Sequence, residues 1–334
     1  QQLRGHPAVI PSRETLVGLQ SEHKFPAARL EIILRLRDLL KAVGEDAFLA
    51  GRLVLKGGTA LNLCFGPPPR LSVDLDFNYI GALEAEKASE ERPATISTLE
   101  RIARRAGYRV QLSRDEHAGR KLYLRYSSSL GGEGRLDMDI NFMHRIPLAG
   151  TQHLPFWCPS GDAELLVTVV GSAELIAGKA IALLDRVAPR DLYDMASIQK
   201  RRRTFPLGNE TRSMFIALSG VLSQPLTRYS LERLERITDS SVARDLHPML
   251  RNGEQPIAGD LRKEVAQVMR SWLTLSEDET RYVQLLQMGE LKPELVFPKN
   301  REMAEKIRLH PALQWKARNA AFRAHRQPSP SARE

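Results

Sequence analysis

Two stretches of the chain alternate between apolar and polar residues with a period of two. They run from Leu71 to Phe77 and from Arg135 to Phe142, and this alternation predicts two β-strands. Because successive side chains of a strand point to opposite faces, the polar residues of each stretch share one face. These residues are Ser72, Asp74 and Asp76 in the first stretch, and Asp137, Asp139 and Asn141 in the second.

The rest of the pattern predicts short strands and longer helices. Residues 52–55 form a short apolar strand, which Gly57-Gly58-Thr59 breaks before a helical run at 60–63. Apolar residues at helical spacing predict one helix from Leu16 to Leu40. The Glu- and Ala-rich segment 81–93 is expected to be a loop with a helical piece. Further predicted elements are a helix at 94–107, strands at 108–112 and 121–126, helices at 172–185 and from Pro189, and mainly helical chain from 205 to 313.

The acids and glycines in this pattern indicate phosphate chemistry. Asp74 and Asp76 would repel each other on one strand face, and a divalent cation between them would remove that repulsion. Hard carboxylate oxygens suit Mg²⁺, with Mn²⁺ as the alternative. A Gly57-Gly58-Thr59 turn that opens a helix exposes backbone N–H groups to which a phosphate can bind. From these residues alone two interpretations stay open: a metal–nucleotide site, or a turn beside an exposed strand face.

Two blocks of sequence make the first interpretation more specific. The first block is KGGTALNLCFG followed by RLSVDLDF, and the second is ELIAGK, then Arg186, then RDLYD at residues 190–194. In this order and over residues from about 30 to 205, the chain resembles the AbiEii/AbiGii toxin family, a bacterial branch of the DNA polymerase β-like nucleotidyltransferases. A Pro67–Pro69 loop lengthens the usual spacing before Asp74, and Gly58-Thr59 replaces the commoner Gly-Ser.

The resemblance implies a fold and a set of site residues. The fold is α/β (α+β), a polymerase β-like nucleotidyltransferase domain with a mixed sheet, followed by a mostly helical C-terminal domain. A third carboxylate is expected from a neighbouring strand, and Asp139 is preferred over its rival Asp137. By helix spacing alone, Lys179 would be interpreted as a solvated helix residue. The resemblance implies instead that it faces the triphosphate of the NTP. The expected catalytic residues are Asp74, Asp76, Asp139, Lys179, Asp191 and Asp194, of which the first three would bind the metal.

The second block leaves two points open. One of Asp191 and Asp194 is expected to face the site and the other to be structural, and the sequence does not separate them. Asp191 is expected to pair with Arg190 or Arg186 near the start of its helix. The nucleotide-binding residues implied by both blocks are Lys56, Gly57, Gly58, Thr59, Ser72, Lys179 and Arg190.

The composition and charge of the chain are consistent with a protein that binds nucleic acid. The chain has 334 residues, of which 42% are hydrophobic and 27% charged, and its net charge is +9. The positive charge favours a polyanionic partner such as nucleic acid, and the run Lys200-Arg201-Arg202-Arg203 is either a solvated helix end or an RNA contact. No apolar run is long enough to span a bilayer, so the cytoplasm is the expected location and no membrane partner is expected.

The expected domain organisation has four consecutive parts. They are an N-terminal helical segment at 1–45 that packs on the catalytic domain, a nucleotidyltransferase domain at 46–160, a helical block at 161–205 that completes the active site, and a helical C-terminal domain at 206–334 with a basic tail. The last ten residues are expected to be disordered.

The function implied by the resemblance is that of a toxin in a bacterial toxin–antitoxin or abortive-infection (phage-defence) pair. It would move NMP from an NTP to a hydroxyl acceptor, with the tRNA 3′ end as the leading acceptor and a cognate antitoxin encoded beside it. One alternative is an NMPylating transferase that acts on a protein or small molecule. Another is an RNA- or antitoxin-binding module with a degenerate site, against which the retained acids and Lys179 argue. Which NTP is used, the oligomeric state and the mode of neutralisation stay open.

Overall fold

The computed structural model describes residues 10–326, which form two compact units. Within that range, unit 1 comprises the chain up to Gly171 together with Ala243–Pro256, and unit 2 comprises Ser172–Val242 together with the chain from Ile257. Neither unit is continuous in sequence. The division into four consecutive parts therefore stays a prediction beside this two-unit arrangement.

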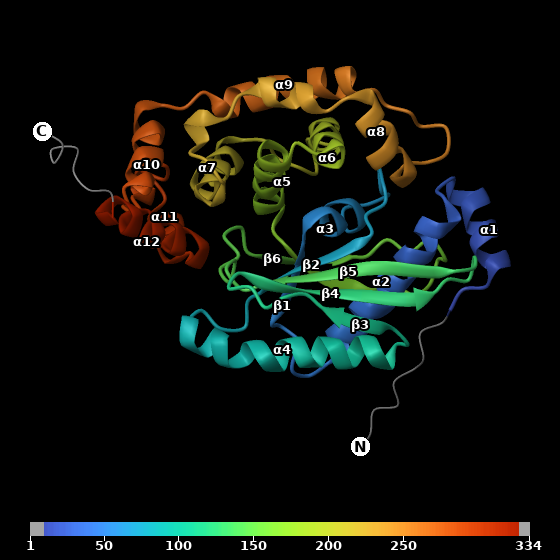
Figure 1. The fold of residues 1–334 in the computed structure, drawn as a ribbon. Helices are drawn as coiled ribbons and strands as arrows, with labels where there is room; N and C mark the ends of the chain where they lie inside the picture. The colour runs from blue at the N-terminus through green and yellow to red at the C-terminus, as the bar shows by residue number, and fades with distance from the viewer. Residues whose placement is uncertain (1–9, 327–334) are drawn as a thin grey trace, which may run out of the picture. The chain divides into compact units, whose positions relative to one another are not determined.

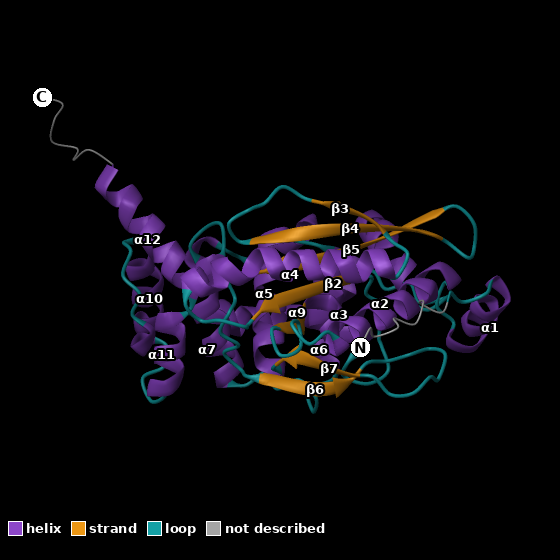
Figure 2. Ribbon diagram, turned by 90° about the horizontal axis from the view of Figure 1, so that it is seen from below, coloured by secondary structure: helices purple, strands orange, loops and turns teal. Residues whose placement is uncertain are grey.

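Unit 1 is built on a mixed sheet of seven strands in the order β3-β4-β5-β2-β1-β7-β6. Figure 2 labels β3, β4, β5, β2, β7 and β6 in this order from top to bottom, and β1, which carries no label there, lies between β2 and β7. The β1–β7 and β2–β5 pairs are parallel and the other pairs are antiparallel. The strands are β1 Leu53–Lys56, β2 Asp74–Tyr79, β3 Arg109–Leu112, β4 Gly119–Ser127, β5 Glu133–Asn141, β6 Thr151–Pro155 and β7 Leu166–Val170. The expected mixed α/β fold is confirmed.

Helices cover both faces of this sheet. Figure 1 shows α4 along one face and α3 on the other. The alternation of β2 and β5 places Leu75, Phe77, Met138 and Ile140 in the core, with each side chain at most 3% exposed. The helices of unit 1 are α1 Arg13–His23, α2 Ala27–Glu45, α3 Gly57–Leu63 and α4 Ala85–Arg105.

The first helical segment is two helices, and the single helix predicted from Leu16 to Leu40 was wrong. α1 ends at His23, and the following Lys24 has a left-handed φ of 63°. Pro26 then precedes α2 as its N-cap residue. Proline fixes its own φ and offers no N–H, so it suits a helix start and disfavours helix continuation from the residue before it.

Two further boundaries differ from the predicted ones. Residues 85–105 form the single helix α4, with Pro93 inside it, where a loop with a helical piece was expected up to residue 93. Its Ala- and Glu-rich composition favours helix, and the buried Ile96, Leu99 and Ile102 hold it on the sheet despite the missing proline N–H. The strand predicted from Leu71 begins only at Asp74, so Ser72 precedes β2 and does not share its face.

Unit 2 is helical, as expected for residues 205–313. Its helices are α5 Ser172–Arg186, α6 Pro189–Lys200, α7 Asn209–Leu218, α9 Ala258–Leu273, α10 Glu277–Gln287, α11 Arg301–Leu309 and α12 Pro311–Arg326, and α8 Asp239–Asp245 leads the chain back to unit 1. Of the last ten residues, which were expected to be disordered, 325–326 end α12 and the rest lie outside the described residues.

Among the helices that the structure describes, none is long and apolar enough to cross a membrane.

Candidate active site

The acidic residues of β2 and β5 meet because these two strands run parallel in register. Asp74 lies opposite Asp137, and Asp76 lies opposite Asp139. Side chains of directly paired residues point to the same face, about 5 Å apart at Cβ. The structure therefore confirms that two acidic strand faces exist, and it places them side by side.

Asp139 carries the clearest electrostatic signal in this group. Burial raises the pKa of its carboxyl, Lys121 opposes that rise, and the negative charge of Asp76 adds to it. The Lys121 Nζ lies 3.7 Å from the Asp139 Oδ2. Lys56, which is paired with Asp76 across β1 and β2, also lowers the pKa of Asp139. The carboxyls of Asp76 and Asp139 are thus close enough to repel each other.

Asp137 is engaged in a different contact. The Arg135 Nε donates to the Asp137 Oδ1 at 2.7 Å, and the Arg135 Nη2 donates to the Asp137 Oδ2 at 2.9 Å. This two-point hydrogen bond raises the pKa of Arg135. The Arg135 guanidinium also stacks 4.4 Å from the centre of the Tyr123 ring. An arginine clamp therefore holds Asp137, whereas Asp139 has two lysines near it and no such clamp.

The glycines that open α3 lie against the acids. Gly57 has a left-handed φ of 72°, and a Cβ at this position would lie 2.4 Å from the Asp76 Oδ2. A Cβ on Gly58 would lie 2.9 Å from the Ser72 Oγ. The Thr59 hydroxyl, which was expected to meet a phosphate, donates to the backbone carbonyl of Asp74 in this structure. The turn is thus fitted closely to the start of β2.

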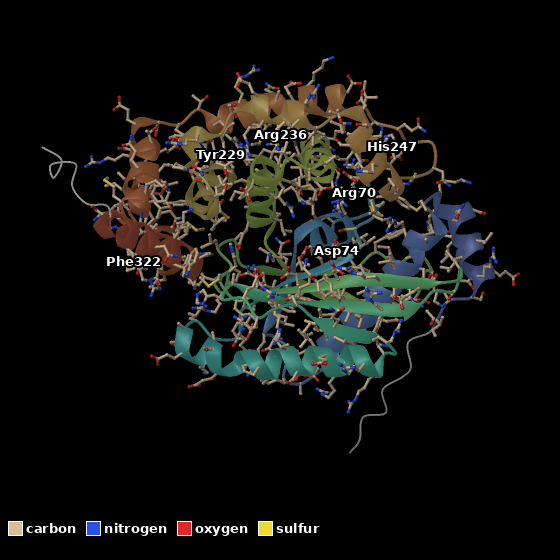
Figure 3. The ribbon with its side chains drawn as sticks, in the orientation of Figure 1. Arg70, Asp74, Tyr229, Arg236, His247 and Phe322 are labelled. Atoms are coloured by element: carbon tan, nitrogen blue, oxygen red, sulfur yellow. The ribbon has the colours of Figure 1, made fainter. Side chains whose placement is uncertain are left out.

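Three charged residues of this region had no role in the sequence-based prediction. Lys121 and Arg135 come from the β4–β5 hairpin, and Arg70 comes from the loop before β2. Arg70 is 3% exposed, and its Nη2 lies 3.1 Å from where a Gly58 Cβ would be. Figure 3 labels Arg70 beside α3 and Asp74 between α3 and the sheet. For Lys121, the antiparallel hairpin register with β5 was the signal that could have found it.

The residues of the second block form one buried cluster in unit 2. The Lys179 Nζ lies 2.9 Å from the Asp191 Oδ1 and 2.9 Å from the Asp194 Oδ2. Arg186, one of the two expected partners, also pairs with Asp191, at 3.0 Å. Arg190 is half-buried in the first turn of α6. Lys179 is therefore not a solvated helix residue, and both aspartates bind it.

The donor chemistry around Asp139 fits a divalent cation. Asp74, Asp76 and Asp139 offer hard oxygen ligands. The pKa of Asp139 is raised by burial and, to a smaller extent, by repulsion from Asp76, and a cation would relieve that repulsion. Within residues 10–326, however, no three acidic, His or Cys side chains already gather round one point in a way that could hold a metal ion. A bound cation would have to draw these side chains together.

The fold and this arrangement of acidic residues, glycines and basic side chains are those of a nucleotidyltransferase. Comparison with known proteins gives the family. The model of the family described as "Nucleotidyl transferase AbiEii toxin, Type IV TA system" matches residues 38–326. The chain belongs to this family of nucleotidyltransferase toxins from type IV toxin–antitoxin systems. The expected family and the expected enzyme class are confirmed.

One solved structure supports the fold. MenT4, a nucleotidyltransferase toxin from Mycobacterium tuberculosis, superposes with a TM-score of 0.58 at 21% identity, covering 88% of this chain and 98% of that chain. JHP933 from Helicobacter pylori gives a TM-score of 0.46 at 19% identity, covering 76% of this chain and 97% of its own. No curated protein sequence matches. The family implies an NTP substrate and a cognate antitoxin.

Proposed function

We propose that this toxin transfers NMP from an NTP to the 3′-terminal hydroxyl of an RNA, with tRNA as the leading acceptor, in a Mg²⁺-dependent reaction. The observation that best supports this proposal is the parallel register that sets Asp76 opposite Asp139, beside the glycines that open α3. NTP and RNA are both found in the cytoplasm, where we expect the protein to act. We also expect the cognate antitoxin to be encoded beside it.

Asp139 is proposed as the acceptor of the proton from the attacking hydroxyl. Burial raises its pKa, and a carboxylate with a raised pKa takes up a proton more readily. The hydroxyl oxygen then bonds to the α-phosphorus, the bond from that phosphorus to the bridging oxygen breaks, and pyrophosphate leaves. Asp74, Asp76 and Asp139 would hold Mg²⁺, which supplies positive charge to the reacting phosphates.

Other residues of unit 1 would bind the nucleotide. The backbone N–H groups of Gly57 and Gly58 and the ammonium of Lys56 lie on the β1–α3 side of the acids, where they would contact the polyphosphate. Ser72 lies against Gly58 and would support the same turn. A catalytic role for Lys179, Asp191 and Asp194, and nucleotide binding by Lys179 and Arg190, are proposed on the family resemblance alone.

Transfer of label from each NTP tests this function. Purified protein is incubated with one α-labelled NTP at a time and total RNA, in Mg²⁺, in Mn²⁺ or in EDTA. We expect label in RNA of tRNA size, no label in EDTA, and no label with Asp74→Asn at an unchanged melting temperature, because a ligand charge is removed from an accessible strand face. Wild-type transfer by Asp74→Asn would refute the metal assignment.

The same assay separates the alternatives. Label on protein or on a small molecule, with none on RNA, would favour the NMPylating transferase. Absence of label with every NTP and acceptor, while RNA is still bound, would favour a binding module with a degenerate site.

A further inference from the structure

Four charged residues form one row across the sheet of unit 1. Lys56 of β1 is paired with Asp76 of β2, Asp76 with Asp139 of β5, and Asp139 with Lys121 of β4. Because directly paired residues point to the same face, the row presents two carboxylates between two ammonium groups. Lys121 is the member of this row to which the family resemblance assigns no role.

The two ends of the row differ in what lies beside them. At the Lys56 end, the chain continues directly into Gly57, whose Cα approaches the Asp76 carboxylate. At the other end, Lys121 lies next to Asp139, with its Nζ 3.7 Å from the Asp139 Oδ2. The Lys121 side chain is 38% exposed, so its ammonium can reach solvent while it stays near Asp139.

This asymmetry separates a nucleotide side from an acceptor side. In the proposed function, the NTP polyphosphate lies at the β1–α3 end and Asp139 takes the proton of the attacking hydroxyl. The acceptor must therefore approach Asp139 from the end at which Lys121 lies. An RNA acceptor brings negative charge with its reacting hydroxyl, because the terminal nucleotide is joined to the chain through a phosphate.

We propose that Lys121 binds a backbone phosphate at the 3′ end of the acceptor RNA and so positions the terminal hydroxyl beside Asp139. The inference rests on the proposed function and assigns an acceptor-binding residue to it. A lysine suits this role, since its ammonium is a compact charge on a flexible stem that can move from a carboxylate to a phosphate. Without such a role Lys121 would have little effect, because a half-exposed lysine–aspartate pair contributes little to the stability of the fold.

Equilibrium binding of bulk tRNA to the full-length protein, at several salt concentrations, tests the proposal without any turnover. We expect Lys121→Met to weaken tRNA binding about tenfold, as for removal of one charge-assisted hydrogen bond. We also expect the slope of log K against log salt to become shallower by about 0.7, the value for one phosphate contact on a single strand. Lys121→Arg keeps the charge and should restore most of the affinity.

Lys41→Met serves as the matched control. Lys41 also lies in unit 1 and has a carboxylate, that of Glu45, 4.0 Å from its Nζ, but it is on α2. We expect this variant to bind tRNA as the wild type does. Melting curves of all variants check that each one is folded.

Transfer kinetics provide the second readout. Lys121→Met should raise the KM for tRNA and leave the KM for the NTP unchanged. A raised KM for the NTP alone would place Lys121 on the nucleotide side, and unchanged tRNA affinity with an unchanged salt slope would reduce it to a surface ion pair. Either result overturns the proposal. Failure of the wild type to label any RNA would instead refute the proposed function, while the binding assay would still report on Lys121.

Discussion

At the scale of single residues, the Asp76 carboxylate has its space only because residue 57 is a glycine. A Cβ there would lie 2.4 Å from the Asp76 Oδ2, and the backbone φ of 72° also disfavours any other residue. We expect Gly57→Ala to displace Asp76 and to lower the transfer rate about 10²-fold, the typical cost of misplacing a reacting group by about 1 Å. Single-turnover transfer measures the effect.

Gly51 offers a control that isolates the backbone cost. Its φ is 73°, and nothing lies within 4 Å of where its Cβ would be. Gly51→Ala and Gly57→Ala should therefore each lose about 1–2 kcal/mol of stability through left-handed strain. If Gly51→Ala impaired activity as much as Gly57→Ala, strain and not the clash with Asp76 would be the cause.

Replacing Asp139 with asparagine should have opposite effects on stability and on transfer activity. Its folded pKa is raised above the ordinary value of 3.8 by burial and by Asp76, so the folded state binds more protons than the unfolded chain between those two pKa values. The contribution of Asp139 to the free energy of unfolding therefore falls as pH rises from 3.8 to the folded pKa. At pH 7 the ionised carboxylate destabilises the fold. Because the Asp139 side chain is 42% exposed, solvent screens this effect, and we expect Asp139→Asn to abolish transfer and to raise the melting temperature at pH 7 only slightly.

The pH dependence of melting checks the sign. The gain in melting temperature of Asp139→Asn over the wild type should shrink as pH is lowered from the raised folded pKa to the ordinary pKa of 3.8, and it should be absent below 3.8, because wild-type Asp139 is then protonated in both states. A variant that melts below the wild type at pH 7 would show that the ion pair with Lys121 outweighs the cost of burial.

At the scale of elements, strands β1 to β5 were predicted, whereas β6, β7 and several boundaries were not. The alternation of β5 marks its buried and acidic faces directly, because period two is a local property of the chain. The break at Pro26 and the continuation of α4 through Pro93 depend on whether tertiary packing compensates for a missing N–H, which local sequence does not determine.

The candidate site was predictable to a similar degree. Asp74, Asp76 and Asp139 followed from strand faces and from the resemblance. Their neighbours Lys121 and Arg70 were not predicted. The place of Lys121 depends on strand register and that of Arg70 on loop placement, and both depend on contacts between separate parts of the chain. Lys179 was found through the resemblance, but its burial with Asp191 and Asp194 depends on how α5 packs on α6.

The packing of α5 on α6 depends on this buried cluster. Lys179 is 8% exposed, while its partners Asp191 and Asp194 are 4% and 0% exposed. Its removal would take the lysine cation away from both buried carboxylates and leave Asp191 with Arg186 alone, so we expect Lys179→Met to destabilise the protein by about 3–5 kcal/mol. Chemical denaturation measures the loss of stability, and Lys179→Arg should recover part of it.

Lys200→Met is the matched control in the same unit. Lys200 is 69% exposed and lies 3.1 Å from Glu264, so its removal should cost less than about 1 kcal/mol. If Lys179→Met and Lys200→Met were equally stable, the cluster of Lys179, Asp191 and Asp194 would not be what holds α5 against α6. Loss of activity in Lys179→Met demonstrates a catalytic role only if Lys179→Arg is stable and still impaired.

At the scale of the whole molecule, the net charge of +9 should make RNA binding depend steeply on salt. We expect the run at 200–203 to contribute less to RNA binding than its four charges suggest. Lys200 pairs with Glu264, and Arg201 stacks on Phe205 and has its pKa lowered by burial. Arg202 and Arg203 are the exposed arginines of this run.

We therefore expect the double change Arg202→Gln and Arg203→Gln to make the slope of log K against log salt shallower by about 0.7 for each RNA phosphate that the protein no longer binds. Adding Lys200→Gln and Arg201→Gln should change the slope little further. Arg104 and Arg105, exposed at the end of α4, form the control pair, and their change to Gln should leave the slope as in the wild type. An unchanged slope in the Arg202→Gln and Arg203→Gln variant would remove this run from the RNA-binding surface. The basic residues of α12, such as Arg318, would then be the next to test.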